Sequence, residues 1–328
     1  MSEKMYLGVD IGGTAVKIGK VTEEGTVLET ESYAVNFDGY ETPILQTVIK
    51  SCRKFMNRYG MDQDNCPGIG VSATGAINTK TGCVDGSAGH IRNWEHSRIK
   101  ESIEREFGIR TSVINDANAA ALGEVWTGAA RNRENVVVIT IGTGVGGGII
   151  TDGKILLGRD GFAGEIGHIP IQISGERCSC GNRGCLERYG SASALVRDVR
   201  KAVREGRINH LSEDEIDGRK IFELADHGDN VILEIIDRWI GCIASGIVGL
   251  VHIFNPELIL IGGGVSAQEK YFISPLQKKV KESVMPHFAR GLELRSADLG
   301  NEAGLVGAVY YFIQTTECNI LPKNYKGI

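Results

Sequence analysis

The chain has 328 residues, 42% of them hydrophobic, and a formal net charge of −5 at pH 7. This length allows two domains with separate cores, and the acidic balance excludes a general attraction to nucleic acid or to anionic membrane. The longest apolar runs, at 136–141 and 258–261, are far too short to cross a bilayer, and the first residues do not resemble a secretion leader. We therefore expect a soluble, cytoplasmic protein without a dedicated DNA-binding role.

Short β-branched runs that end in glycine-rich turns recur along the chain. The three runs, each with the turn that follows it, are 6–9 with 10–14, 136–141 with 142–148, and 258–261 with 262–264. Helical segments such as 101–107 and 117–126 separate the strands, and this alternation predicts an α/β architecture. The first two turns fall in different halves of the chain, which indicates an internal duplication with one phosphate loop in each half.

The first glycine turn has the composition of a phosphate-binding loop. Gly12 and Gly13 let backbone N–H groups approach phosphate oxygens. Thr14 adds a hydroxyl donor, and Asp10 offers a carboxylate that could hold nucleotide-bound Mg²⁺ through water. Taken alone, a β-hairpin without function explains this turn equally well. The glycine clusters after two further apolar strands favour a nucleotide.

Asn115 and Asp116 close a predicted strand at 111–114, and an alanine-rich helix follows. Side chains at the carboxyl end of such a strand face the ligand site of an α/β sheet, where Asp116 could accept a proton from a hydroxyl that attacks phosphorus. The alternative is that Asp116 only caps the helix. We also expect the domain switch here. The predicted domains are residues 1–116, completed by the C-terminal helix 303–328, and a larger α/β domain of residues 117–302.

The second glycine turn also permits an oxidoreductase. Gly142, Gly144 and Gly147 have the spacing of a dinucleotide-binding fingerprint. That fingerprint should open a helix, whereas residues 148–154 continue as a β-rich strand with a turn at 152–153. The match is therefore weak. The chain also lacks the Walker P-loop pattern, which excludes P-loop ATPases.

Three cysteines and one histidine lie close together in the sequence. His168, Cys178, Cys180 and Cys185 can supply the four tetrahedral ligands of a structural Zn²⁺. The remaining cysteines are scattered singly: Cys52, Cys66, Cys83, Cys242 and Cys318. A disulfide is the competing interpretation, but the odd local count and the expected compartment argue against it. Because four protein ligands leave no position for a catalytic water, the metal should shape a loop.

Glu165, His168 and Glu187 belong to the same region of the chain. Fixed beside a metal loop, they would form a rigid set of hydrogen-bond donors and acceptors suited to sugar hydroxyls. Otherwise the two glutamates are solvated loop charges and His168 is a core histidine.

These elements together resemble the ROK family of sugar kinases and repressors, within the actin/hexokinase-like superfamily. The similarity runs from the turn at 10–14 through residues 115–124, 141–168 and the cysteine loop to residues 304–308. It implies a two-domain α/β, actin/hexokinase-like (ribonuclease H-like) fold with a cleft between the domains. It also implies ATP-dependent phosphorylation of a hexose at its 6-hydroxyl, with glucose as the expected substrate. N-Acetylmannosamine, N-acetylglucosamine, fructose and β-glucosides are alternatives, as is a non-catalytic sugar-binding sensor.

The resemblance also implies roles for particular residues. Asp116 is the expected general base. The expected sugar-binding residues are Gly75, Asn115, Asp116, Glu165, His168 and Glu187. Those expected to bind ATP and its Mg²⁺ are Asp10, Gly12, Gly13, Thr14, Lys17, Gly142, Thr143, Gly144, Gly262 and Gly263. His168 would turn one ring nitrogen to Zn²⁺, beside Cys178, Cys180 and Cys185, and the other to the sugar. A homodimer is expected from the resemblance alone.

Two further expectations concern enzyme class and specificity. Repressors of the family carry a DNA-binding domain ahead of the sugar-binding fold, whereas here the phosphate loop begins at Asp10, so we expect an enzyme. Residues 86–94 are expected to form the variable wall of the sugar site, where His90 or Arg92 could reach a substituent. Trp94 is expected to pack in the core.

Overall fold

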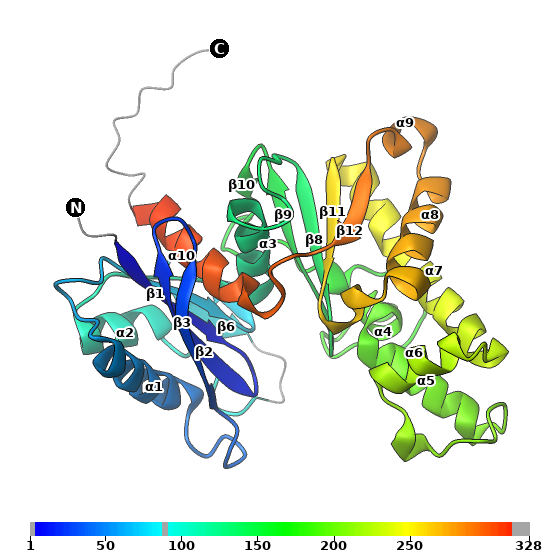
Figure 1. Ribbon diagram of the computed structural model, residues 1–328, viewed down its shortest axis with the longest axis horizontal. Helices are drawn as coiled ribbons and strands as arrows, with labels where there is room; N and C mark the ends of the chain where they lie inside the picture. The colour runs from blue at the N-terminus through cyan, green and yellow to red at the C-terminus, as the bar shows by residue number, and fades with distance from the viewer. Residues whose placement is uncertain (1–3, 87–90, 317–328) are drawn as a thin grey trace. The chain divides into compact units, whose positions relative to one another are not determined.

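The computed structural model describes residues 4–86 and 91–316, and the chain divides into two compact units (Figure 1). The first unit comprises Met1–Arg131, Ile155–Ala163 and Asn301–Ile328, and the second comprises Asn132–Lys154 and Gly164–Gly300. Within the described ranges, no helix combines the length and the apolar character that a membrane span requires.

The first unit is built on a five-stranded sheet of order β3-β2-β1-β4-β7. Strand β1 runs antiparallel to β2 and parallel to β4, and β4 runs parallel to β7. The strands are β1 (Met5–Ile11), β2 (Ala15–Thr22), β3 (Val27–Ala34), β4 (Ile69–Ala73) and β7 (Thr111–Asn115), with a separate hairpin of β5 (Ala76–Asn78) and β6 (Cys83–Gly86). The helices are α1 (Ile44–Tyr59), α2 (Ile99–Phe107), α3 (Asp116–Trp126) and α10 (Ala303–Thr316).

The two faces of this sheet bury different helices. Leu7, Val9 and Ile11 alternate along β1 and share one core with the apolar side chains of α1 and α2. Tyr6, on the opposite face, packs with Phe312 of α10 in a second cluster. Helix α10 therefore packs within the first unit; residues 317–328 of the helix expected at 303–328 lie outside the described ranges.

Helix α3 also belongs to the first unit, although the sequence analysis began the second domain at residue 117. The reason is its close packing against α10. Gly307 of α10 approaches α3 so closely that a Cβ there would lie 1.7 Å from the carbonyl oxygen of Ala119. The first compact segment consequently continues to Arg131.

The second unit repeats the same sheet topology, with the order β10-β9-β8-β11-β12. Its strands are β8 (Val136–Ile141), β9 (Val145–Thr151), β10 (Lys154–Ile155), β11 (Leu258–Gly262) and β12 (Glu293–Ser296). Its helices are α4 (Glu187–Gly190), α5 (Ala192–Arg204), α6 (Gly218–Asp226), α7 (Asn230–Phe254), α8 (Ser274–Ser283) and α9 (Pro286–Ala289). Strand β8 is antiparallel to β9 and parallel to β11, and β11 is parallel to β12. The shared topology agrees with the predicted duplication, and β9 is the strand expected in place of a Rossmann helix.

Candidate active site and metal centre

The turn between β1 and β2 surrounds Asp10 with polar groups. Asp10 is opposite Lys17 in the strand register, and its Oδ1 accepts a hydrogen bond from the hydroxyl of Ser72 on β4. Burial raises the pKa of the Asp10 carboxyl, against the lowering effects of the Ser72 hydrogen bond and the Lys17 charge. A buried carboxylate of this kind is well suited to a cation that arrives with a ligand.

The other predicted residues of this turn have different surroundings. The Gly12 N–H donates to the carbonyl of Ala15 at 3.0 Å, so it serves the hairpin itself. Thr14 is exposed at the tip. Lys17 Nζ donates to the carbonyl oxygen of Asn301 at 2.5 Å and is thereby held against the segment that leads into α10.

Asn115, Asp116 and Gly75 are brought together at the carboxyl end of β7. Asn115 Nδ2 donates to the Gly75 carbonyl at 3.1 Å and to Asp116 Oδ1 at 3.0 Å. Asn115 Oδ1 accepts from the N–H groups of Ala117 and Asn118, so Asn115 is the cap of α3 and Asp116 is the first residue of the helix. The capping role considered for Asp116 in the sequence therefore belongs to its neighbour.

The glycine turn of the second unit connects β8 to β9. The Gly142 N–H donates to the Gly144 carbonyl at 3.0 Å, and Thr143 is exposed between them. Gly262 ends β11, and Gly263 follows with φ +91°, where a Cβ would lie 2.1 Å from the Ile141 carbonyl oxygen. Only glycine fits that approach, which brings the third glycine cluster to the same edge of the sheet as the second.

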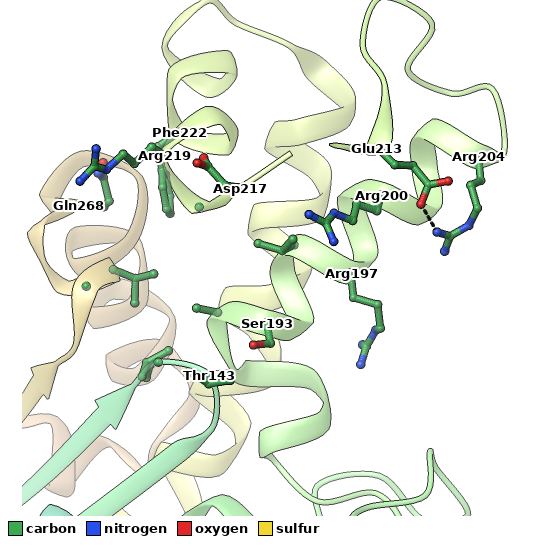
Figure 2. Close-up of a pocket in the computed structure, with 17 residues that line it drawn as sticks. Thr143, Ser193, Arg197, Arg200, Arg204, Glu213, Asp217, Arg219, Phe222 and Gln268 are labelled. Atoms are coloured by element: carbon green, nitrogen blue, oxygen red, sulfur yellow. Dashed lines mark hydrogen bonds and ion pairs between the residues drawn. The ribbon is translucent and has the colours of Figure 1, made fainter. Parts of the chain in front are cut away.

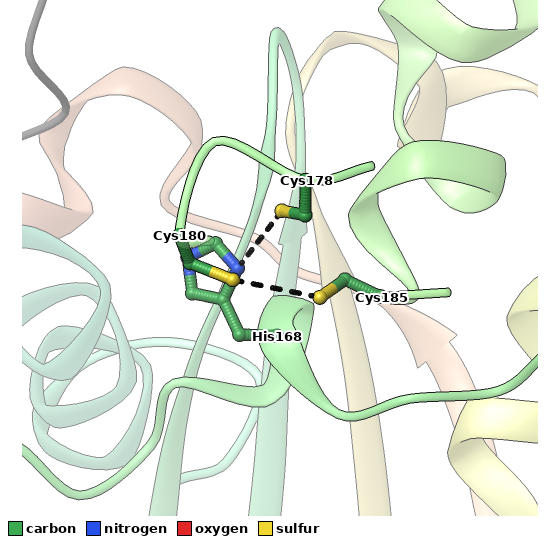
Figure 3. Close-up of side chains that lie close together, drawn as sticks. All are labelled: His168, Cys178, Cys180 and Cys185. Carbon is green, nitrogen blue, oxygen red and sulfur yellow. Dashed lines mark hydrogen bonds between the residues drawn. The ribbon is translucent and has the colours of Figure 1, made fainter. Parts of the chain in front are cut away.

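The three cysteines and His168 form a compact cluster in the second unit (Figure 3). Their ligand atoms all lie within 4.8 Å of one another, with 3.6 Å from Cys180 Sγ to Cys185 Sγ and 3.6 Å from Cys178 Sγ to His168 Nδ1. Two sulfurs bound to one tetrahedral Zn²⁺ at about 2.3 Å would be roughly 3.8 Å apart, so the cluster has the dimensions of a four-ligand metal site. None of the three thiols forms a disulfide in this structure.

The electrostatics of the cluster also favour a cation. The pKa of the Cys185 thiol is raised to about 12 by burial and by the neighbouring Cys180 and Cys178. Burial acts to raise the pKa of Cys178 as well, but hydrogen bonds from the other cysteines and His168 bring it to about 7. Three thiolates at this spacing repel one another unless a positive ion lies between them.

The predicted sugar-binding residues of the second unit lie beside this cluster. His168 Nε2, the nitrogen that faces away from Cys178, is 3.9 Å from Glu165 Oε2. Partial burial raises the pKa of the Glu165 carboxyl. The charge of Glu187 acts in the same direction, and His168 acts in the opposite one. Glu187 begins α4 immediately after the cysteine loop. His168 can therefore serve the cluster with one ring nitrogen while the other lies near a carboxylate.

A cavity of about 900 Å³ in the second unit escaped the sequence analysis (Figure 2). It adjoins the glycine turn at Thr143, and α5 and α6 form much of its wall. Among its lining residues are Gly142, Thr143, Ser193, Arg200, Asp217, Phe222, Gly264, Val265 and Gln268. Apolar and polar groups are mixed here as in small-molecule pockets. Gly142, Thr143 and Gly264 belong to the predicted glycine turns, whereas no motif marks the lining residues of α5 and α6, because these come from separate helices.

The expected variable wall at 86–94 is only partly visible, because residues 87–90 lie outside the described ranges. Trp94 is fully buried, and its Nε1 donates to the Thr74 carbonyl at 2.8 Å. The packing role expected for Trp94 is confirmed.

The chain is similar to known proteins over almost its whole length. The ROK family model matches residues 6–315. A glucokinase of Halalkalibacterium halodurans is 36% identical over 94% of this chain and 94% of its own. Among solved structures, a ROK family glucokinase of Streptomyces griseus with glucose and AMPPNP is 33% identical, with a TM-score of 0.78 over 94% of this chain and 98% of that one. A putative N-acetylmannosamine kinase of Listeria monocytogenes is 31% identical, with a TM-score of 0.79 over 95% of this chain and 99% of that one.

These similarities confirm the predicted α/β architecture and the actin/hexokinase-like fold that the resemblance to the ROK family implies. The chain belongs to the ROK family.

Proposed function

We propose that this protein is an ATP-dependent sugar kinase that transfers the γ-phosphoryl group to the 6-hydroxyl of glucose. The observation that carries the proposal is the position of Asp116 at the end of β7, where it accepts a hydrogen bond from Asn115, which also donates to the Gly75 carbonyl. Glucose is preferred because relatives named glucokinase are similar over nearly the full chain. N-Acetylmannosamine is the alternative, favoured by the similarity to the Listeria monocytogenes structure.

Asp116 would act as the general base. Its carboxylate accepts the proton of the sugar hydroxyl as that oxygen attacks the γ-phosphorus, and the bond between this phosphorus and the leaving oxygen of ADP breaks. The side-chain amide of Asn115 donates a hydrogen bond to Asp116 Oδ1 and so fixes the orientation of the carboxylate. Asn115 itself and the backbone at Gly75 would contact sugar hydroxyls.

Zn²⁺ is the metal that the donor set of the cluster fits best, because three thiolates and one imidazole are its common structural ligands. It would supply a rigid anchor for the loop, without an open position for water. His168 would then offer Nε2 to the sugar, with Glu165 and Glu187 beside it.

ATP would extend from the glycine turns into the cavity of the second unit. The turn at Gly142, Thr143 and Gly144 would hold phosphates, with the nucleoside between α5 and α6. The turn at Asp10, Gly13 and Thr14 has the groups to bind phosphate oxygens through its backbone and hydroxyl, and their Mg²⁺ through Asp10. Nucleotide-bound Mg²⁺ would neutralise the charge that develops on the transferred group.

A coupled ADP-release assay with Mg·ATP over a panel of hexoses and N-acetylhexosamines tests this proposal. Turnover on glucose that is lost in Asp116→Asn is the expected result. Turnover on N-acetylmannosamine alone would show that N-acetylmannosamine, and not glucose, is the substrate. Sugar binding by thermal shift without any turnover would refute the kinase assignment and indicate a sensor.

A further inference from the structure

The segment that follows the cysteine loop holds both ends of the second glycine turn. Glu187 Oε2 accepts a hydrogen bond from the N–H of Val145, where β9 begins, at 3.1 Å. Ala192, the first residue of α5, donates its N–H to the carbonyl oxygen of Gly142 at 3.0 Å. One short stretch of chain therefore fastens the turn where it leaves β8 and where it enters β9.

The Glu187 carboxylate is also in steric contact with the turn. A Cβ on Gly144 would lie 2.3 Å from Glu187 Oε2, so the carboxylate lies directly against the backbone that should hold phosphate. The residue before Glu187 anchors its backbone. Leu186 is buried, and its N–H donates to the Ile169 carbonyl at 2.9 Å.

Only one of the two carboxylate oxygens is used in this contact. Among the described residues, Oε2 receives the Val145 N–H, and no hydrogen bond reaches Oε1. A carboxylate can accept several hydrogen bonds at once, so Oε1 remains available to a ligand hydroxyl.

We propose that Glu187 is a positioning residue for the donor phosphates as well as a sugar ligand. Oε2 holds the phosphate turn in its binding conformation, while Oε1 accepts a hydroxyl of the sugar. This inference rests on the proposed kinase function. A sugar that fixes the carboxylate also fixes the turn, so sugar and nucleotide tighten each other's binding by the same factor.

The test measures the affinity of Mg·AMPPNP by calorimetry in the absence of sugar, on metal-loaded protein. In Glu187→Ala the Val145 N–H loses its acceptor, and we expect the affinity to fall about tenfold or more, because a donor left without an acceptor costs about that factor. Glu187→Gln retains an acceptor oxygen, so its nucleotide affinity should stay within about twofold of wild type while its KM for sugar rises.

Glu165→Ala is the matched control, since Glu165 lies beside the same cluster but makes no hydrogen bond to the turn among the described residues. It should raise the KM for sugar and leave the affinity for Mg·AMPPNP unchanged. Glu187→Ala with wild-type affinity for Mg·AMPPNP would overturn the proposal, because a residue that binds only sugar has no effect in its absence.

A second variant tests the same contact independently, in case Glu187→Ala does not fold. Gly144→Ala presses on Oε2 from the turn and should weaken nucleotide and sugar binding together; unchanged binding of both would overturn the proposal. Wild-type protein that binds Mg·AMPPNP but turns over no sugar would refute the proposed function while the nucleotide comparison still decides the role of Glu187 at the turn.

Discussion

The two units share a strand order but differ in the chemistry of the corresponding turn. Asp10 lies between Lys17 and Ser72 in the register of β1 with its neighbours. Thr140 holds the corresponding place in β8, and glycines stand opposite it on both neighbouring strands. Charged and polar side chains therefore surround the first turn, whereas the strands beside the second turn offer mainly backbone groups.

The second unit compensates with a side chain from another part of the chain. Strands β8, β9 and β11 contain no acidic residue, and the carboxylate at their turn is Glu187, which follows the cysteine loop. The duplicated scaffold thus supplies the same backbone turn twice, and charge is added locally. We expect substitutions in the first unit to affect the chemical step most and those in the second to affect binding most.

The largest effect should come from Asp116→Asn in the first unit. Removal of a general base costs about 10² to 10⁴ in rate, while the isosteric amide preserves the shape of the site. We expect kcat to fall by this factor with sugar binding retained, measured by ADP release and by thermal shift. Glu101→Gln, an exposed carboxylate of the same unit, is the control. Retained turnover in Asp116→Asn would mean that another group is the base. It would also contradict the expectation that the first unit affects the chemical step most.

Asp10→Asn should have the next largest effect, with opposite consequences for activity and stability. Loss of the carboxylate that would hold nucleotide-bound Mg²⁺, the ion that neutralises charge on the transferred group, should cost about 10² to 10³ in kcat/KM for Mg·ATP. The folded protein without ligands should become more stable at neutral pH, because the neutral amide avoids the desolvation that raises the pKa of Asp10.

The stability gain of Asp10→Asn should depend on pH. Because the pKa of Asp10 is raised in the folded protein, its contribution to stability is present at low pH and is lost as pH rises through the folded value. The Tm difference between variant and wild type, measured in EDTA without nucleotide, should therefore be smallest in acid and grow towards neutral pH. A constant difference would contradict the burial of an ionisable group here.

Cys180→Ser tests the second unit. Loss of one ligand should release the metal and weaken sugar binding about ten- to a hundredfold, because His168, Glu165 and Glu187 lose their fixed positions. Metal content by elemental analysis and sugar affinity by calorimetry check this expectation. Cys242→Ser, a cysteine of the same unit outside the cluster, should change neither. Normal sugar affinity in metal-free Cys180→Ser would show that the metal does not support the sugar site.

The parts of the site that could be predicted from sequence are those encoded by local spacing. The glycine turns and the cysteine loop are such segments, and the strand after Gly148 was readable from its β-rich composition. The cavity beside Thr143 was not predictable, because its walls come from α5, α6 and the segment after β11. The Ser72 contact with Asp10 was equally hidden, since it depends on the parallel register of β1 and β4.

Ser72→Ala should have the smallest effect and tests whether these polar neighbours distinguish the two turns. Ser72 is fully buried, and its hydroxyl donates to Asp10, which favours the ionised carboxylate. Without it the pKa of Asp10 should rise further, so the acid limb of kcat/KM moves to higher pH and the KM for Mg·ATP rises about three- to tenfold.

Ser112→Ala on β7 is the matched control for Ser72→Ala, because the buried Ser112 Oγ has no hydrogen-bond partner in the described part of the chain. It should leave the pH profile unchanged. If Ser72→Ala also leaves the profile unchanged, the hydroxyl is irrelevant to the charge of Asp10. The functional difference between the two turns would then depend on the Asp10 carboxylate alone. The residue opposite Thr140 in the second unit is a glycine, so that turn has no side-chain donor equivalent to Ser72.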